Sequence, residues 1–298
     1  LHLYLTEWHL LDAASTPSGA ILVIGRETWY AECERWSSKT PRHELAATIG
    51  DGDWAVVVAT PANARECFAA LPLFALEVAL AIGQAQAAIV SPPAVFLLSR
   101  VIQASDQSTH AGLWGLARSA RAETSLPVHC VDGSATTGVE QRWAVAELEA
   151  VLRRDDWLVP RLARARQAAH AAIAHAASAH VVTGGTGGLG LLTERWLAQR
   201  GDARTLALAS RSGVLARGTA AEWKGLHATS VVTLLQRCDA AEGAHVGRLM
   251  VRVTGAASAM GAWHVAGVLA DGLLLQQTAH TLCHVHAPKA HGACLLQR

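Results

Sequence analysis

The stretch His180-Val-Val-Thr-Gly-Gly-Thr-Gly-Gly-Leu-Gly190 decides the fold of this 298-residue chain. A β-branched run passes at once into a turn with the pattern G-x-G-x-x-G, at Gly185, Gly187 and Gly190, and a helical pattern follows at 189–200. Glycines at this spacing allow a tight turn, and the helix N-terminus presents free N–H groups to phosphate oxygens. The stretch predicts a dinucleotide-binding βα unit. No GK[ST] follows, so a nucleoside-triphosphate P-loop is not supported.

The ends of the next strands carry further candidate ligand groups. About twenty residues after Gly190, where an NAD site has an acidic residue, the chain has Ser210-Arg211-Ser212-Gly213. A hydroxyl and a guanidinium bind a 2′-phosphate that a carboxylate would repel, which favours NADP(H) over NAD. The alternative is that Arg211 is a solvated loop residue. Asp239 ends the third strand, in position for an adenine amino group, and Ala266 and Gly267 end the fourth with small side chains near a nicotinamide ribose.

Short β-branched runs alternate with Ala/Leu-rich stretches, which is typical of open parallel α/β sheets. In the first half we expect strands at 20–24, 54–59, 95–102, 128–131 and 157–162, and helices at 62–86, 111–124 and 144–154. In the second half we expect strands at 180–183, 205–209, 231–238 and 262–266, and helices at 189–200, 220–228, 245–253 and 278–286. The predicted fold class is α/β, with two tandem Rossmann-like open parallel-sheet subdomains, the second incomplete at its C-terminus.

The predicted domains are a cofactor-free unit at 1–166, a connector at 167–179 and a nucleotide-binding unit at 180–298. Only the second unit has a glycine loop. In the first unit Gly25 is followed by Arg26 and Glu27, whose side chains would obstruct a pyrophosphate.

Composition excludes several classes of protein. The formal net charge is +1 and 16% of residues are charged, which argues against a nucleic-acid-binding surface or a polybasic membrane patch. A hydrophobic fraction of 51% argues against general disorder. The six cysteines form no CxxC pair and indicate reduced thiols. The apolar run 68–90 contains Pro72, Glu77 and Gln84, and predicts a buried helix rather than a membrane span. We therefore expect a soluble, cytoplasmic protein with no nucleic-acid or membrane partner.

The sequence does not support two other kinds of site, a metal site and a hydrolase site. The 15 histidines include a group near the C-terminus that invites a metal interpretation: His280, Cys283, His284, His286 and His291. These residues show no recognised zinc spacing and no carboxylate partner, so we predict no metal site. A Ser/His/Asp hydrolase is also not supported, because the chain has no G-x-S-x-G elbow.

Taken together, these motifs resemble the ketoreductase domain of modular type I polyketide synthases, a branch of the short-chain dehydrogenase/reductase superfamily. In the second half the matching segments are VVTGGTGGLG (181–190), ALASRSG (207–213), RCDA (237–240), HVAGVLADGLL (264–274) and HAPKAHGACLL (286–296). In the first half they are LYLTEW (3–8), HAGLWGLARSARAE (110–123) and DDWLVPRLARA (155–165), where the family has a cofactor-free structural subdomain. Fatty-acid synthase ketoreductases share much of this pattern and are the alternative family.

The resemblance implies NADPH-dependent reduction of a β-ketoacyl thioester, carried on an acyl carrier protein, with neighbouring synthase domains as partners. Lys289 matches the family's catalytic lysine, and Asp271 retains the second acid of a Leu-Asp-Asp motif associated with hydroxyl stereochemistry. The implied cofactor-binding residues are Thr183, Gly184, Gly185, Thr186, Gly187, Gly188, Leu189, Gly190, Ser210, Arg211, Cys238, Asp239, Ala240, His264, Ala266, Gly267 and Lys289.

The family's catalytic Ser and Tyr have no match in this sequence. Nine residues follow Lys289 and none of them is Ser or Tyr, while the only tyrosines are Tyr4 and Tyr30. We therefore expect a C-terminally truncated domain that is inactive alone. Two hypotheses remain: the cofactor-binding portion of a ketoreductase, or a non-catalytic structural segment of a megasynthase.

Overall fold

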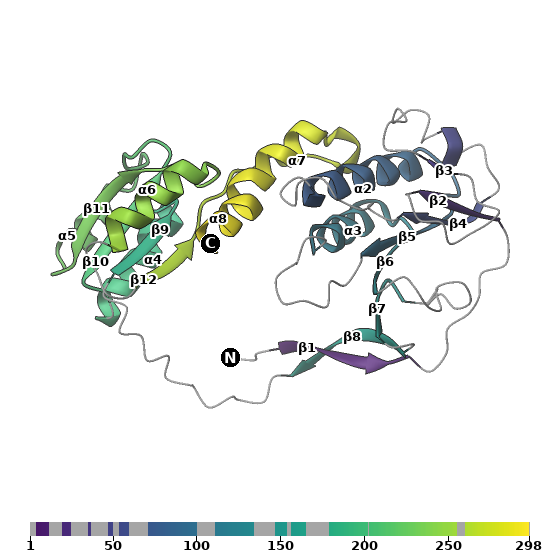
Figure 1. Ribbon diagram of the computed structural model, residues 1–298, viewed down its shortest axis with the longest axis horizontal. Coiled ribbons are helices and arrows are strands. Elements are labelled where there is room, and N and C mark those ends of the chain that lie inside the picture. The colour runs from purple at the N-terminus through teal and green to yellow at the C-terminus, as the bar shows by residue number, and fades with distance from the viewer. Residues whose placement is uncertain are drawn as a thin grey trace. The chain divides into compact units, whose positions relative to one another are not determined.

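A computed structural model of the chain describes residues 4–11, 20–24, 35–36, 47–49, 54–59, 71–99, 111–133, 147–153, 156–164, 179–201, 203–254 and 260–297. The chain forms two compact units (Figure 1). The N-terminal unit comprises Leu1–Ala169 with Gly272–Leu282, and the glycine-loop unit comprises His170–Asp271 with Cys283–Arg298. The features expected at 25–27, and the connector 167–179 except Ala179, lie outside the described residues.

The glycine-loop unit is built on a parallel sheet with the strand order β11-β10-β9-β12 among the described residues. These strands are β9 (Ala179–Thr183), β10 (Thr205–Ser210), β11 (Val232–Arg237) and β12 (Met260–His264). The helices of this unit are α4 (Gly188–Arg200), α5 (Ala220–His227), α6 (Gly243–Thr254) and α8 (Gly292–Gln297), with a π-helical turn η2 (Ala287–His291). The same half of the sequence also forms the 3₁₀ turn η1 (Leu274–Gln276), which belongs to the N-terminal unit, and α7 (Ala279–His286), which has residues in both units. The strands and helices expected in this half are therefore present, with ends shifted by one or two residues.

Apolar side chains cover both faces of this sheet. On one face Val181 packs with Val246 and Leu249 of α6, and on the other Val182 packs with Leu191 and other residues of α4 and α5. Successive residues of a strand point to opposite faces, so an uninterrupted apolar run is what a doubly covered strand needs.

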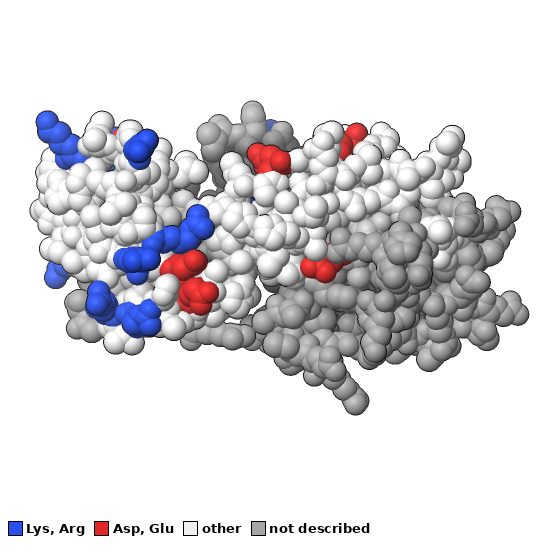
Figure 2. Space-filling view, turned by 90° about the horizontal axis from the view of Figure 1, so that it is seen from above, with Lys and Arg blue, Asp and Glu red and all other residues white. Residues whose placement is uncertain are grey.

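Figure 2 shows the Lys and Arg side chains of this unit at several separate places rather than in one patch.

The N-terminal unit contains a larger, mixed sheet. Among the described residues its order is β1-β8-β7-β6-β5-β4-β2-β3. The strands are β1 (Tyr4–Leu10), β2 (Ala20–Ile24), β3 (Arg35–Trp36), β4 (Trp54–Ala59), β5 (Ala94–Ser99), β6 (Val128–Gly133), β7 (Glu149–Arg153) and β8 (Asp156–Arg164). The open α/β prediction is confirmed, but β8 runs antiparallel to both β1 and β7, so this sheet is not wholly parallel.

The helix expected at 144–154 is wrong, because β7 lies there. The run Ala-Glu-Leu-Glu-Ala-Val-Leu has high helix propensity. However, Ala150, Val151 and Leu152 are all buried, between β6 on one side and β8 on the other. Three consecutive buried residues suit an interior strand, whereas a surface helix would bury only one face. Tertiary burial therefore overrides the local helix preference.

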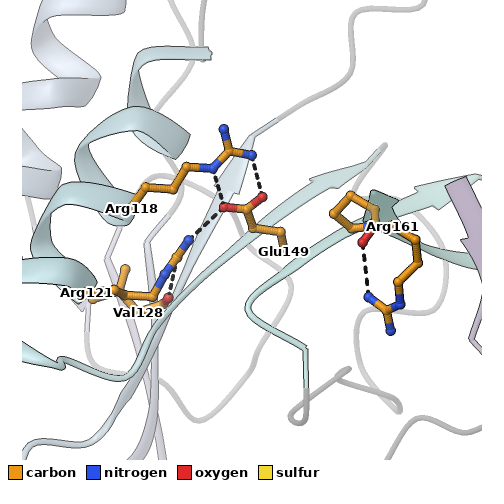
Figure 3. Close-up of polar contacts among 6 residues, drawn as sticks. Arg118, Arg121, Val128, Glu149 and Arg161 are labelled. Carbon is orange, nitrogen blue, oxygen red and sulfur yellow. Dashed lines mark hydrogen bonds and ion pairs between the residues drawn. The ribbon is translucent and has the colours of Figure 1, made fainter. Parts of the chain in front are cut away.

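Glu149, the first residue of β7, is held by two arginines of helix α3 (Ala111–Thr124; Figure 3). Arg118 donates from Nε to Oε1 at 2.7 Å and also bonds Oε2, while Arg121 donates from Nη2 to Oε1 at 2.7 Å. The hydrogen bond from Arg118 is the main reason that the pKa of Glu149 is lowered. Arg121 also donates to the carbonyl of Val128 at 2.8 Å. This cluster fixes α3 to both β6 and β7.

Helix α2 (Leu71–Ala87) lies within the apolar run 68–90 and packs against the core of this unit. Residues 62–70 of the longer helix expected there lie outside the described residues. Leu80 and Ile82 are fully buried. Among the described residues, no helix combines the length and the apolar character that crossing a membrane would require.

A segment from the second half of the sequence completes the N-terminal unit. Leu274 is 4% exposed and packs into the same cluster as α2 and α3. Its N–H donates to Glu123 Oε1 at 2.8 Å, and Gln84 Nε2 donates to the carbonyl oxygens of Leu274 and Gln277 at 2.9 and 2.8 Å. The chain therefore leaves the glycine-loop unit after Asp271 and returns to it at Cys283. The sequence alone assigned all of 180–298 to one domain.

We expect Leu274→Ala to lower the free energy of unfolding by about 2–4 kcal/mol, because it empties a buried position in this core. Urea unfolding followed by tryptophan fluorescence measures the change. Leu275→Ala is the matched control: Leu275 is 61% exposed, and its truncation should change stability by less than about 0.5 kcal/mol. Equal effects of the two substitutions would contradict the packing of this segment.

Candidate functional site

A cavity of about 670 Å³ lies at the carboxyl ends of the parallel strands in the glycine-loop unit. This is where open α/β sheets bind their ligands, and the volume falls in the usual range of about 300–1,000 Å³. The wall residues that the sequence predicts are Thr183, Gly184, Thr186, Gly187, Gly188, Leu189, Gly190, Ser210, Arg211, Cys238, Asp239, Ala240, Ala266 and Gly267. The wall residues that it does not predict are Ser212, Ala216, Val265, Val268 and Pro288.

The glycine turn is shaped by close backbone contacts. Gly184 has φ of 70°, and a Cβ on it would lie 2.9 Å from the Ala266 nitrogen. A Cβ on Gly190 would overlap the carbonyl oxygen of Gly184. By contrast, a Cβ on Gly188 would meet no protein atom within 4 Å. The first turn of α4 is therefore open toward the cavity, and its N–H groups suit an anion.

Arg211 is the one cationic side chain on the described part of the cavity wall. It is exposed and lies in a turn in which Gly213 N–H donates to Ser210 Oγ at 3.1 Å. Cys238 N–H donates to the carbonyl of Ser210 at 2.8 Å, which joins this turn to the end of β11. The turn thus places a hydroxyl and a guanidinium at the same edge of the cavity.

Asp239 lies on the wall next to Cys238. Its Oδ1 accepts from Ala241 N–H at 3.0 Å, and its own N–H donates to His245 Nδ1 at 3.2 Å. These bonds fix the carboxylate just before α6. Burial raises the pKa of the Cys238 thiol, and the charge of Asp239 raises it further. The cavity therefore presents a fixed carboxylate beside a neutral thiol.

Four predicted site residues are not on the cavity wall: Gly185, His264, Asp271 and Lys289. Asp271 is exposed. The Lys289 side chain lies against the wall residue Gly267, since a Cβ on Gly267 would be 2.7 Å from Lys289 Cε. The His264 ring contacts the wall residue Thr183: its Nδ1 lies 2.7 Å from Thr183 Oγ1, and its Nε2 lies 3.0 Å from the carbonyl oxygen of Lys289. Lys289 and His264 therefore adjoin the cavity without lining it.

Glu194 is a buried acid that the sequence analysis did not single out. It is fully buried, and neither carboxyl oxygen has a hydrogen-bond partner among the described residues. A Cβ on Gly185 would lie 2.5 Å from Glu194 Oε1, so the carboxyl group lies directly behind the glycine turn. Burial raises its pKa to about 9. Its spacing of three residues from both Leu191 and Leu197 places it on the buried face of α4, a signal that the sequence contains.

The C-terminal histidines do not gather into a metal site. Within the described parts of the chain, no three His, Cys, Asp or Glu side chains are placed to hold a metal ion. The pKa of His286 is lowered, chiefly because its imidazole is partly buried and also because His291 repels its cationic form.

Comparisons with known proteins find relatives of this chain. A family model described as "KR domain" matches residues 178–298. The chain is 35% identical over 198 residues to the spectinabilin polyketide synthase system protein NorA of Streptomyces orinoci, covering 63% of this chain and 10% of that protein. It is 32% identical over 271 residues to polyketide synthase GfsE of Streptomyces halstedii, covering 86% of this chain and 7% of that protein. The chain thus spans a tenth or less of the length of these two relatives.

Solved structures show the same fold. A-type ketoreductases from a modular polyketide synthase superpose with a TM-score of 0.78 at 22% identity, covering 99% of this chain and 71% of that chain. The first ketoreductase of the tylosin polyketide synthase gives a TM-score of 0.75 at 23% identity, covering 99% of this chain and 69% of that chain.

We expect the buried carboxyl of Glu194 to make stability fall as pH rises. The folded chain keeps this proton up to about pH 9, whereas the unfolded chain releases it near 4.5. Between these values the folded state binds the extra proton, so this group lowers the free energy of unfolding by about 1.4 kcal/mol per pH unit.

Urea unfolding between pH 6 and pH 8 measures this slope. Glu194→Gln should remove that part of the slope, whereas the exposed Glu242→Gln should keep the wild-type slope. If wild type and Glu194→Gln show the same slope, Glu194 is ionised in the folded chain.

Proposed function

Because residues 178–298 belong to the KR domain family found in polyketide synthases, we propose that this chain binds NADPH for the reduction of a β-ketoacyl thioester to a β-hydroxyacyl thioester. The substrate is carried by an acyl carrier protein, and neighbouring synthase domains are the partners. One observation carries this proposal: a single cavity brings together the glycine turn, the Arg211 guanidinium and the Asp239 carboxylate. Both relatives are polyketide synthases, which favours this family over the fatty-acid synthase alternative.

The wall groups fit the parts of NADPH. The open first turn of α4, at Gly187 and Gly188, receives the pyrophosphate. Ser210 and Arg211 bind the 2′-phosphate, for which a guanidinium is the best-matched side chain. Asp239 accepts from the adenine amino group. When bound, NADPH supplies the hydride for the β-carbon of the substrate.

Lys289 and Asp271 are the residues that we assign to the reacting end of the site. The Lys289 ammonium holds the nicotinamide ribose, and its charge favours ionisation of a neighbouring proton donor. Asp271 guides the orientation of the substrate and so the stereochemistry of the hydroxyl product.

The described cysteines Cys130, Cys238, Cys283 and Cys294 are free thiols, which supports a reducing, cytoplasmic location.

A second candidate function is cofactor binding without reduction. The only tyrosines in the sequence are Tyr4 and Tyr30, so residues 178–298 supply the lysine of the site but no tyrosine as a proton donor. On this alternative the 298-residue chain binds NADPH as a segment of a synthase, while the proton donor is absent from these residues.

We expect Arg211→Glu to weaken NADPH binding by about tenfold or more while leaving NADH binding within about twofold. A charge-assisted hydrogen bond to the 2′-phosphate is lost, and a repulsive carboxylate takes its place. Titration of tryptophan fluorescence measures both affinities. Arg217→Glu makes the same charge change at a residue off the cavity wall and should have a smaller effect. An unchanged preference between the two cofactors would refute the assignment of Arg211.

Turnover by the 298-residue chain alone tests the second candidate function. We expect the purified 298-residue chain to bind NADPH but not to oxidise it when a β-ketoacyl thioester is added. Loss of NADPH absorbance is the measurement, with the same mixture lacking thioester as the blank. Steady turnover would show that these residues contain a proton donor of their own and would exclude the second candidate.

A further inference from the structure

We propose that His264 is a positioning residue for Lys289, acting through a hydrogen bond to the carbonyl oxygen of Lys289. This inference rests on the proposed function, because it concerns how the lysine is presented to the cofactor cavity. The contacts that carry it run from β9, through the end of β12, to the π-helical turn η2.

The hydrogen bonds of His264 assign its tautomer. The Lys289 carbonyl can only accept, so the imidazole Nε2, at 3.0 Å, carries the hydrogen. Nδ1 is then the acceptor for the Thr183 hydroxyl, at 2.7 Å. Thr183 Oγ1 in turn accepts from Ala266 N–H at 3.3 Å. Every hydrogen bond in this series, from Ala266 N–H to the Lys289 carbonyl, therefore has one donor and one acceptor when the imidazole is neutral.

The bond reaches the helix at an irregular point. Pro288 contributes no N–H to the ladder, and the helix widens to a π-turn over Ala287–His291. Gly292 N–H bonds to the carbonyls of both Ala287 and Lys289. The Lys289 carbonyl therefore uses its two lone pairs for Gly292 and His264. A π-turn is less regular than an α-helix, and a side chain that holds one of its carbonyls restricts the turn.

Two glycines allow the His264 ring and the Lys289 side chain to lie close to the backbone. A Cβ on Gly292 would lie 3.2 Å from His264 Cε1 and 3.1 Å from the Ala240 carbonyl oxygen. On the other side, the Lys289 side chain lies against Gly267. The ring therefore packs against Gly292, and the lysine stem packs against the wall residue Gly267. His264 holds the backbone of Lys289, and Gly267 provides the surface along which its side chain extends.

The position of Lys289 can be measured without any cofactor. The chain has three lysines, Lys39, Lys224 and Lys289, so reductive ¹³C-methylation gives three side-chain signals that Lys→Arg variants assign. In His264→Leu we expect the Lys289 signal to move from its wild-type position, because the lysine stem loses its contact with Gly267, while the signal of Lys224, on α5, stays unchanged. In His264→Gln, whose amide can still donate to the carbonyl, the signal should stay near its wild-type position. His227→Leu, at an exposed residue of α5, is the control.

Thr183→Val serves if His264→Leu does not fold. It keeps the shape of the side chain but removes the hydroxyl that orients the ring, so the Lys289 signal should shift in the same direction by a smaller amount. A Lys289 signal that is the same in wild type, His264→Leu and Thr183→Val would overturn the proposal.

NADPH affinity tests whether His264 acts through Lys289. We expect His264→Leu to weaken binding about fivefold, the usual effect of one lost hydrogen bond, but to have little effect when Lys289→Met is already present. Equal weakening in both backgrounds would mean a general structural role and would overturn the proposal. If the wild-type chain binds no NADPH, the proposed function fails, while the lysine signals still decide the role of His264.

Discussion

The close packing of the glycine turn against β12 requires glycine, which has no side chain, at positions 184 and 190. A Cβ on Gly184 would press on the nitrogen of Ala266, and one on Gly190 would overlap the turn itself. Because the turn can approach the end of β12 so closely, Thr183 reaches both the Ala266 N–H and the His264 ring. The cavity edge and the contact to the Lys289 carbonyl both follow from that approach. A larger residue at Gly184 would push β12 away and would displace the helix that His264 holds.

The cavity edge of the glycine-loop unit could be predicted from the sequence, because the signals for it are local. Glycine spacing, strand ends and helix periodicity placed the turn and the 210–213 and 238–240 segments at one edge of the sheet, and the structure brings them to one cavity. The prediction failed at β7, where burial between two strands outweighs a strong local helix preference. Glu194 was not predicted as a buried acid either, although its spacing from Leu191 and Leu197 places it on the buried face of α4.

The contacts that local patterns could not reveal join residues far apart in the sequence. Thr183 and His264 are 81 residues apart, and Gln84 is 190 residues from Leu274. No periodicity encodes such pairings, since they depend on which strand ends next to which helix. These contacts also explain two polar residues in apolar surroundings. Gln84 interrupts an apolar helix because it holds two carbonyls of a distant segment, and His264 ends a strand because it bonds both Thr183 and a helix carbonyl.

The path of residues 272–282 constrains how such a domain can be exchanged between synthases. A genetic crossover near residue 170 would join a new glycine-loop unit to an old N-terminal unit. Leu274 would then come from one protein, whereas the α2 and α3 side chains that it packs against would come from the other. Its hydrogen-bond partners Gln84 and Glu123 would also come from the other protein. Hybrids cut at that point would carry a mismatched core even when each half is intact. If residues 272–282 were exchanged together with 71–124, Leu274 and the residues that it contacts would come from the same protein.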